Sequence, residues 1–353
     1  MNYRRFRLGC DQCLPAMVGV RFSAGANLAI FMCWLLLAGC SRSNSVANVE
    51  KSPSDNLASS SAAEQTKSKG KLGLSVLTMT NPFFKDLADA FQEEATAKGY
   101  EVVVTSGEFD VAAQQNQVKD FIVAKCAAIV LCPCNATGIG TAIQEANTAG
   151  IPVFTADTAC LAPDAKVVSH IASENLGGGR LAAQAMIEAL GSSGGKVLIL
   201  DYKQGESCLL RVQGFKEVVA KHNSDHPSQK IDIVAELPGD GKRDQGFKCT
   251  EDALQTHPDL NGIFAINDPS ALGAIAAIEK ANKAGQIKIV AFDGQPEGIQ
   301  AIEEGKIFDE PQQFPKRIGQ MTAQTIARYF DGEKIEAVQL IPTELYRKSG
   351  RPK

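Results

Sequence analysis

From Lys71 onward the sequence alternates short apolar runs with longer amphipathic stretches, and this alternation constrains the fold more than any other feature. The apolar runs are four to eight residues long, as expected for strands that are buried on both faces. The expected strands are Leu72–Met79, Glu101–Thr105, Ala128–Cys132, Val153–Ala156, Val167–Ile171, Val197–Leu200, Ile231–Leu237, Ile263–Ile266 and Lys288–Phe292. Nearly apolar strands that alternate with helices predict an α/β fold made of parallel sheets.

The stretches between the strands carry apolar side chains at helical spacing. The stretch Phe83–Lys98 is followed by Gly99, and the stretch Ala271–Ala284 is followed by Gly285. Glycine is a common residue just after a helix, so we expect both helices to end there. The strands are numerous enough for two doubly wound sheets, and the alternation breaks near Ser173-Glu174. The sequence therefore predicts two parallel-sheet domains with a boundary at that point.

The first 40 residues have the composition of an export signal. Arginines precede an apolar stretch from Ala24 to Ala38, which is shorter than a typical membrane span. It ends in Leu37-Ala38-Gly39-Cys40, which resembles a bacterial lipobox, where the cysteine is lipidated and becomes the mature N-terminus. We predict a lipoprotein signal peptide over residues 1–39, with an uncleaved anchor helix as the alternative. Translation from Met17 instead of Met1 would give a signal of more ordinary length, and both starts stay open.

Residues 40–70 are predicted to be a flexible tether. Nine serines occur between residues 41 and 70, and few side chains there are apolar. Such a segment cannot bury enough surface to fold. The whole chain carries 36 basic and 40 acidic residues, a formal net charge of −4 at pH 7. A mildly acidic protein is a poor partner for a phosphate backbone, so we expect no nucleic-acid binding.

Polar side chains recur where the predicted strands end. Asn81 follows the first strand, Asp157 the fourth, Asn267 the eighth and Asp293 the ninth. Each of these residues alone is explained as a helix cap or turn residue. Because ligands of such sheets bind at the carboxyl ends of the strands, four residues at equivalent ends favour one shared ligand between the two domains. Amides and carboxylates suit a neutral polyhydroxyl compound.

Two aromatic residues, Phe83 and Phe84, directly follow the first of these strand ends. Either ring could stack on the apolar face of a sugar. The alternative is core packing, which we expect for one of the two.

These residues lie in segments that resemble the ribose-binding protein family of periplasmic substrate-binding proteins, over about residues 71–346. The matching segments are Asn81-Pro82-Phe83-Phe84, Val168–Ser173, Arg211 with Gly214-Phe215, Asn267-Asp268 with Ala271–Ala274, Phe292-Asp293-Gly294, and Gln313 with Pro315. Carried over by position, the resemblance implies the ligand residues Asn81, Phe83, Phe84, Asp157, Arg211, Asn267, Asp293 and Gln313. It adds Arg211 and Gln313 to the strand-end set and gives Arg211 the role of a bidentate donor to sugar hydroxyls.

Two positions depart from the family's pattern. Thr158 stands where the family has an arginine, and Gly241 stands where it has an aromatic ring over the second face of the sugar. Losing one stacking ring and one charged donor would weaken ribose binding, so we infer a different ligand, such as a hexose or a polyol. Phe109 or Tyr202 could replace the missing ring, and the choice stays open.

The resemblance also implies how the protein works. It predicts an N-terminal lobe of residues 71–173 and 314–343 and a C-terminal lobe of residues 174–313 and 344–353, joined by a three-segment hinge that closes over the sugar. A monomer in the periplasm, anchored through lipidated Cys40, would then deliver the sugar to an ABC permease, without a cofactor. The alternative is a sensor that presents the closed form to a membrane receptor or kinase. A transcription repressor is disfavoured, because a signal and a tether precede Lys71.

Six cysteines follow the lipobox. Cys134 and Cys160 come after neighbouring parallel strands, so we predict a disulfide between them. Cys208 with Cys249 is a second candidate pair, whereas Cys126 and Cys132 are expected as buried free thiols.

We expect no metal site and no catalysis. The sequence Cys132-Pro133-Cys134 has no evident further metal ligands. Gly191–Gly195 fits the Gly-x-Ser-x-Gly pattern of hydrolases, but a helix precedes it and a strand follows, which is the reverse of a nucleophile elbow.

Overall fold

The computed structural model describes residues 68–351. The predicted signal peptide, Cys40 and nearly all of the predicted tether lie outside the described residues. Among the helices of residues 68–351, none combines the length and the hydropathy needed to cross a bilayer.

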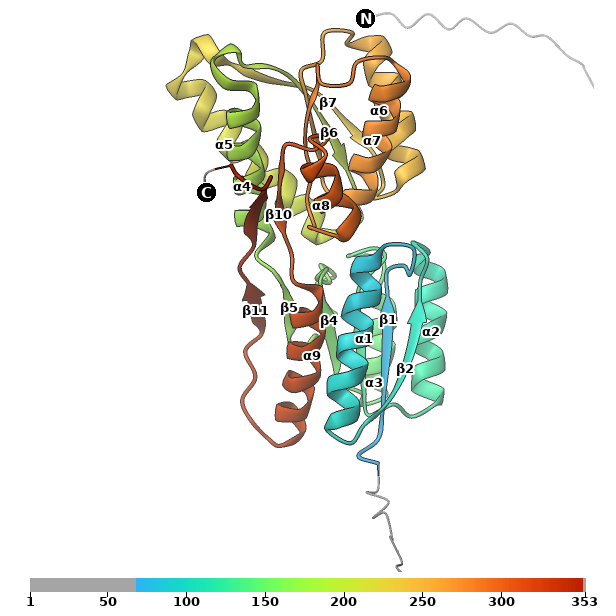
Figure 1. The fold of residues 1–353 in the computed structure, drawn as a ribbon. Helices are drawn as coiled ribbons and strands as arrows, with labels where there is room; N and C mark the ends of the chain where they lie inside the picture. Colours follow the sequence, from blue (N-terminus) through green and yellow to red (C-terminus); the bar gives the residue numbers. More distant parts are fainter. Residues whose placement is uncertain (1–67, 352–353) are drawn as a thin grey trace, which may run out of the picture. The chain divides into compact units, whose positions relative to one another are not determined.

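The described residues form two six-stranded sheets (Figure 1). The first has the strand order β2-β1-β3-β4-β5-β11, and every neighbouring pair in it is parallel. Its strands are β1 (Lys71–Val76), β2 (Glu101–Ser106), β3 (Ala128–Leu131), β4 (Val153–Ala156), β5 (His170–Ser173) and β11 (Val338–Ile341). Its helices are α1 (Pro82–Ala97), α2 (Val111–Val123), α3 (Gly140–Thr148) and α9 (Pro315–Phe330). We call this sheet with these helices the first lobe.

The second sheet repeats this order as β7-β6-β8-β9-β10-β12, with only the β10–β12 pair antiparallel among its pairs. Its strands are β6 (Gly195–Asp201), β7 (Ile231–Pro238), β8 (Gly262–Ala265), β9 (Lys288–Val290), β10 (Asp309–Gln312) and β12 (Glu344–Arg347). Its helices are α4 (Asn175–Leu190), α5 (Glu206–Asp225), α6 (Arg243–Thr256), α7 (Asp268–Lys280) and α8 (Pro296–Glu303). We call this sheet with these helices the second lobe.

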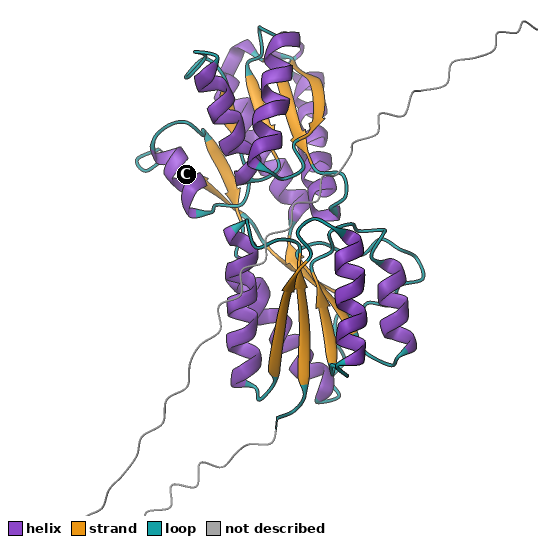
Figure 2. Ribbon diagram, turned by 90° about the vertical axis from the view of Figure 1, so that its right-hand side faces the viewer, coloured by secondary structure: helices purple, strands orange, loops and turns teal. Residues whose placement is uncertain are grey.

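Strand β3 shows why the central strands are apolar at every position. Ala128 and Val130 pack in the hydrophobic cluster that holds the apolar faces of α1 and α9. Ile129 and Leu131 pack in a separate cluster with α2 and α3. Successive side chains of a strand point to opposite faces, and helices cover both faces of the sheet (Figure 2). The continuous apolar run in the sequence is therefore the signature of a sheet enclosed between two helical layers.

The chain passes between the lobes three times: from β5 to α4, from β10 to α9, and from β11 to β12. Figure 1 shows the result for α9, which lies beside α1 although more than 200 residues separate them. The two helices approach closely at Gly319, where an added Cβ would lie 2.2 Å from the carbonyl oxygen of Leu87. The carboxyl ends of the strands in both sheets face the region between the lobes, since the polar residues that follow them line one cavity there.

The predicted α/β fold of two parallel-sheet domains is confirmed, and all nine expected strands occur. Strands β10, β11 and β12 were not expected: β10 and β12 contain no apolar run, and in β11 the polar Gln339 interrupts a short apolar stretch. Helix α7 begins at Asp268, three residues earlier than predicted, since Asn267 caps it and Pro269 fits its first turn. It also ends earlier, at Lys280, because Asn282 adopts a left-handed backbone at φ +55°.

The predicted disulfide between Cys134 and Cys160 is not formed, and Cys208 and Cys249 are also free thiols. The two loops are neighbours, but the side chains diverge. Cys134 Sγ points back toward β1 and lies 3.6 Å from the carbonyl oxygen of Leu77, whereas Cys160 lines a different cavity at the edge of the first sheet. Neighbouring loops are therefore not sufficient for a disulfide, which also needs Cβ atoms that face one another.

Helices α4 and α5 pack with their backbones almost in contact. An added Cβ on Gly179 would lie 2.1 Å from the carbonyl oxygen of Arg211, and one on Gly214 would lie 2.1 Å from that of Leu176. Both obstacles are backbone atoms, which cannot rotate away. The close approach brings α5, and with it Arg211, against the start of the second lobe.

We predict that Gly179→Ala lowers the free energy of unfolding by about 1–3 kcal/mol, because the methyl group forces α4 and α5 apart. Alanine is otherwise the better helix former, so propensity alone would change stability in the opposite direction. Denaturant unfolding of the variant measures the effect, with the exposed Gln184→Ala on the same helix as a control that stays within about 0.5 kcal/mol. A Gly179→Ala protein as stable as the control would contradict the packing described.

Candidate functional site

One cavity between the two lobes is lined by all eight residues that the sequence analysis singled out. They are Asn81, Phe83, Phe84, Asp157, Arg211, Asn267, Asp293 and Gln313. All eight side chains are buried, with exposed fractions of 9% or less. The cavity has a volume of about 40 Å³, more than the ~10–15 Å³ that one water molecule needs.

The two asparagines act as helix caps and as cavity residues at the same time. Asn81 Oδ1 accepts a hydrogen bond from Phe83 N (3.0 Å) at the start of α1, and Asn267 Oδ1 accepts one from Ser270 N (3.1 Å) at the start of α7. The cap uses the side-chain oxygen, so the NH₂ group of the same amide remains available for another hydrogen bond. In Asn267 this group donates to the carbonyl oxygen of Gly241 (3.1 Å). Capping a helix therefore does not prevent either asparagine from lining the cavity.

Arg211 and Asp293 form a buried ion pair at the centre of the cavity wall. Arg211 Nη1 lies 3.3 Å from Asp293 Oδ1 and donates to the carbonyl oxygen of Ile266 (2.8 Å), while Nε donates to Asn175 Oδ1 (2.8 Å). The guanidinium also stacks on the ring of Phe292, 4.0 Å from its centroid. These contacts hold the plane of the guanidinium in one orientation.

Burial raises the pKa of Asp293, and the charge of Arg211 and a hydrogen bond from Gln313 Nε2 (2.7 Å) act against this rise. Gln313 Oε1 is buried and has no hydrogen-bond partner among the described residues. One end of this amide is therefore committed to Asp293, and the other is available to a donor in the cavity.

Asp157 is the second carboxylate of the cavity and has no cation of its own. Its Oδ2 accepts a hydrogen bond from Thr158 Oγ1 (3.2 Å), whereas its Oδ1 is buried without a partner within residues 68–351. The pKa of Asp157 is raised to about 7, mainly by burial; the charge of Arg211 acts against this rise and the nearby Asp293 adds to it. An unpaired buried acceptor is costly, so this oxygen is a strong position for a hydroxyl donor.

Phe83 and Phe84 pack edge to face, with ring centroids 5.1 Å apart. Both belong to the hydrophobic core and both line the cavity. We expected one ring to pack in the core and the other to face the ligand, but both rings do both.

Four hydrogen bonds join the two lobes around the cavity. Tyr202 Oη donates to the carbonyl oxygen of Cys134 (2.6 Å), and Thr158 Oγ1 pairs with Ser207 Oγ (3.0 Å). The backbone N–H of Ala136 donates to the carbonyl oxygen of Gln204 (2.8 Å), and that of Ala159 to Glu206 Oε2 (3.3 Å). The lobes are therefore in a closed arrangement.

The cavity also contains residues that the strand-end analysis left out. Tyr202, Ser207 and Cys208 follow β6, and Phe109 follows β2. The ends of these two strands carry polar and aromatic side chains as well, so extending the same analysis to every strand end would have found them. Phe109 and Tyr202, the two candidates for the missing ring, both line the cavity and pack edge to face at 5.9 Å.

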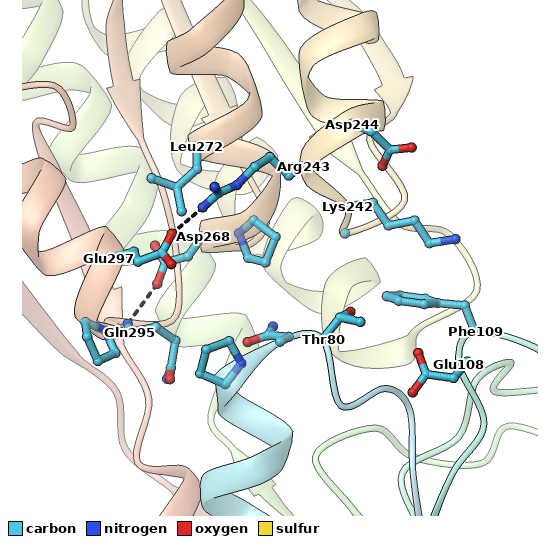
Figure 3. Close-up of a pocket in the computed structure, with 15 residues that line it drawn as sticks. Thr80, Glu108, Phe109, Lys242, Arg243, Asp244, Asp268, Leu272, Gln295 and Glu297 are labelled. Carbon is cyan, nitrogen blue, oxygen red and sulfur yellow. Dashed lines mark hydrogen bonds and ion pairs between the residues drawn. The ribbon is translucent and has the colours of Figure 1, made fainter.

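A larger groove of about 690 Å³ adjoins the cavity and shares Asn81, Phe109 and Gly241 with it (Figure 3). Charged side chains of both lobes line this groove. Glu108 belongs to the first lobe, and Lys242, Arg243 and Glu297 belong to the second. Within residues 68–351, no cluster of three or more His, Cys, Asp or Glu side chains is arranged to hold a metal ion. The 3-10 turn at Gly191–Ser193 precedes β6, so the Gly-x-Ser-x-Gly match is a plain turn.

Comparison with known proteins agrees with this geometry. A family model described as a periplasmic binding protein domain matches residues 72–334. The ribose import binding protein of Escherichia coli (strain K12) is 34% identical over 291 residues, which cover 82% of this chain and 95% of that protein.

Solved structures agree as well. A solute-binding protein of an ABC transporter from Mycobacterium smegmatis with bound glycerol has a TM-score of 0.73 at 30% identity, over 80% of this chain and 95% of that one. A counterpart from Actinobacillus succinogenes with bound D-allose has a TM-score of 0.71 at 26% identity, over 79% of this chain and 98% of that one. All three relatives are named as binding proteins. The chain belongs to the periplasmic binding protein family, and within it to the family that contains the ribose import binding proteins.

Proposed function

We propose that this protein is the substrate-binding component of an ABC-type sugar uptake system, and that it binds a monosaccharide or a related polyol between its lobes. The observation that carries the proposal is the pair of buried acceptors, Asp157 Oδ1 and Gln313 Oε1, that lack partners in the described chain. They share one cavity with the Arg211 guanidinium and two asparagine amides. Acceptors and donors that line the same small cavity match the hydroxyl groups of an uncharged sugar.

The ligand is proposed to differ from ribose. Thr158, in place of an arginine, is 2% exposed, and its hydroxyl is engaged by Asp157 and Ser207. It supplies no charge to the ligand, so the cavity has one cation for two carboxylates. Related proteins have bound ligands as different as D-allose and glycerol. We therefore place the ligand among hexoses, pentoses other than ribose, and polyols.

Hinge closure is part of the proposal. The lobe of residues 71–173 and 314–343 and the lobe of residues 174–313 and 344–353 would separate at the three crossing segments and close over the sugar. A sugar that contacts both lobes favours the closed state by its differential affinity. An ABC permease would then recognise that state. The ribose and D-apiose relatives are named as import binding proteins. No observation favours a sensory role, and we propose no catalytic role.

Asp157→Asn tests the site. We expect the variant to bind the protein's best sugar roughly 10- to 100-fold more weakly, because charged hydrogen bonds contribute about 1.5–3 kcal/mol. The protein alone should be at least as stable at pH 8, since the amide removes a buried charge. Calorimetric titration with D-ribose, D-allose, D-fucose, myo-inositol and xylitol, and thermal unfolding, measure both effects. The exposed Asp164→Asn is the matched control. Unchanged affinity in Asp157→Asn would contradict the assigned site.

Sugar binding should release protons near neutral pH. In the protein without sugar, the pKa of Asp157 is about 7, compared with an ordinary value of 3.8. The protonated Asp157 therefore contributes to the stability of the fold below pH ~4, and this contribution is lost as the pH rises through 7. A hydroxyl donor to this carboxylate favours the ionised form and lowers its pKa. At pH 6 we expect the release of about one proton per sugar bound, and little release at pH 8.5. Titration calorimetry in buffers of different ionisation enthalpy measures this number, and proton uptake at pH 6 would contradict the prediction.

Lipid anchoring through Cys40 is proposed from the sequence alone. We expect the unaltered protein to incorporate radiolabelled palmitate and to sediment with membranes, and Cys40→Ala to do neither, because the thiol is the only acceptor in the lipobox. Cys33→Ala, in the apolar stretch before the lipobox, is the control that should remain labelled. Labelled Cys40→Ala protein would disprove the lipobox.

A further inference from the structure

The second lobe leaves a gap in the cavity wall at Gly241. This residue has φ +65° and follows Asp240 at φ +50°, so two consecutive residues adopt the left-handed backbone. An added Cβ would lie 3.1 Å from Asn267 Nδ2 and 3.9 Å from Phe109 Cε1. A larger side chain would therefore strain the backbone and press on Asn267. The second lobe cannot place a ring here without disturbing a residue of the site.

Phe109 fills this side of the cavity from the opposite lobe. Its ring packs edge to face on Tyr202, with centroids 5.9 Å apart, and Lys242 Nζ lies 4.4 Å from its centroid. A side chain of the first lobe thus contacts two residues of the second lobe, Tyr202 and Lys242. Figure 3 shows Phe109 facing Lys242 at the edge of the large groove. The ring thus lies between the cavity and the groove.

The turn that carries Phe109 is held in an uncommon backbone conformation. Glu108 (φ +47°) and Phe109 (φ +63°) are both left-handed, which is unfavourable for residues of these types. The Glu108 carboxylate accepts hydrogen bonds from Thr78 Oγ1 (2.9 Å), from Met79 N (3.1 Å) and from the Ser106 hydroxyl. The hydrogen bond from Ser106 is the main reason why the pKa of Glu108 is lowered. Phe109 N donates to the carbonyl oxygen of Leu77 (3.1 Å).

The following residue, Asp110, caps α2, with its Oδ1 accepting from Ala112 N (2.8 Å). Backbone strain that surrounding contacts maintain is typical of functional positions. Here these contacts fix where the Phe109 ring stands.

We infer that Phe109 is the aromatic cap of the sugar site, supplied by the first lobe across from Gly241. This inference rests on the proposed sugar-binding function and names a specificity residue for it. Because Phe109 and Gly241 belong to different lobes, the capped cavity is complete only when the lobes are together. The cap would stack on the apolar C–H face of a ring or polyol, at the boundary with the groove.

Variants of the full chain, titrated with D-ribose, D-allose, D-fucose, myo-inositol and xylitol, test the cap. We expect Phe109→Ala to bind the best of these ligands about tenfold more weakly, as the loss of an aromatic stacking contact implies. Phe109→Tyr keeps the ring and should bind within about twofold of the unaltered protein, whereas Phe109→Leu keeps apolar bulk without a ring and should resemble Phe109→Ala. Phe330→Ala, at a partly exposed ring near the end of α9, is the control that should leave affinity unchanged.

The outcomes separate the two claims. If the unaltered chain binds a sugar and Phe109→Leu or Phe109→Ala binds it equally well, the cap is wrong and the proposed function stands. If the unaltered chain binds none of the five compounds, the proposed function is contradicted and the cap with it. A Phe109→Ala protein that fails to fold leaves Phe109→Leu to decide, and thermal unfolding of each variant without ligand identifies that case.

Discussion

The buried ion pair between Arg211 and Asp293 organises the space between the lobes. Charges so deep in a protein persist only when they are paired and hydrogen-bonded, and here Asn175, Ile266, Gln313 and the ring of Phe292 complete the arrangement. Asp157 depends on the same cation, which lowers its pKa, but Arg211 is already bonded to Asp293. Thr158 supplies a hydroxyl and no second positive charge. The unbalanced carboxyl is thus a direct result of one threonine.

Much of the fold could be predicted because it depends on burial. Strands enclosed between two helical layers have to be apolar at every position, and that pattern is visible in the sequence from Leu72 to Phe292. Strand β10 was not predicted, because its sequence, Asp-Glu-Pro-Gln, is polar and contains a proline. Its acid Asp309 is fully buried only because Arg347 and Arg351, some 40 residues later, pair with it. No local pattern carries that information.

Some of the cavity residues could also be predicted from the sequence, and others could not. Asn81, Asp157, Asn267 and Asp293 could be found because strand ends of parallel sheets converge, which is a property of topology. Arg211 and Gln313 could not be found from the residues, since nothing in a helix or a crossing segment distinguishes them from solvated side chains, and only the family resemblance identified them. The disulfide between Cys134 and Cys160 was predicted wrongly because topology places loops and does not orient Sγ atoms. Phe109 could be named from the sequence as a candidate ring, but its position depends on a left-handed turn at Glu108 and Phe109 that no local pattern predicts.

The four hydrogen bonds that join the lobes around the cavity are made by protein groups alone. They favour the closed arrangement to the same extent whether or not a sugar is present, so they shift the resting equilibrium without helping the protein to discriminate. Every 1.4 kcal/mol they contribute raises the ligand-free closed population about tenfold. A membrane partner that recognises only the closed shape would also bind closed protein that contains no sugar. How often it does so would depend on the hydrogen bonds of Tyr202, Ser207 and their neighbours, and not on the sugar.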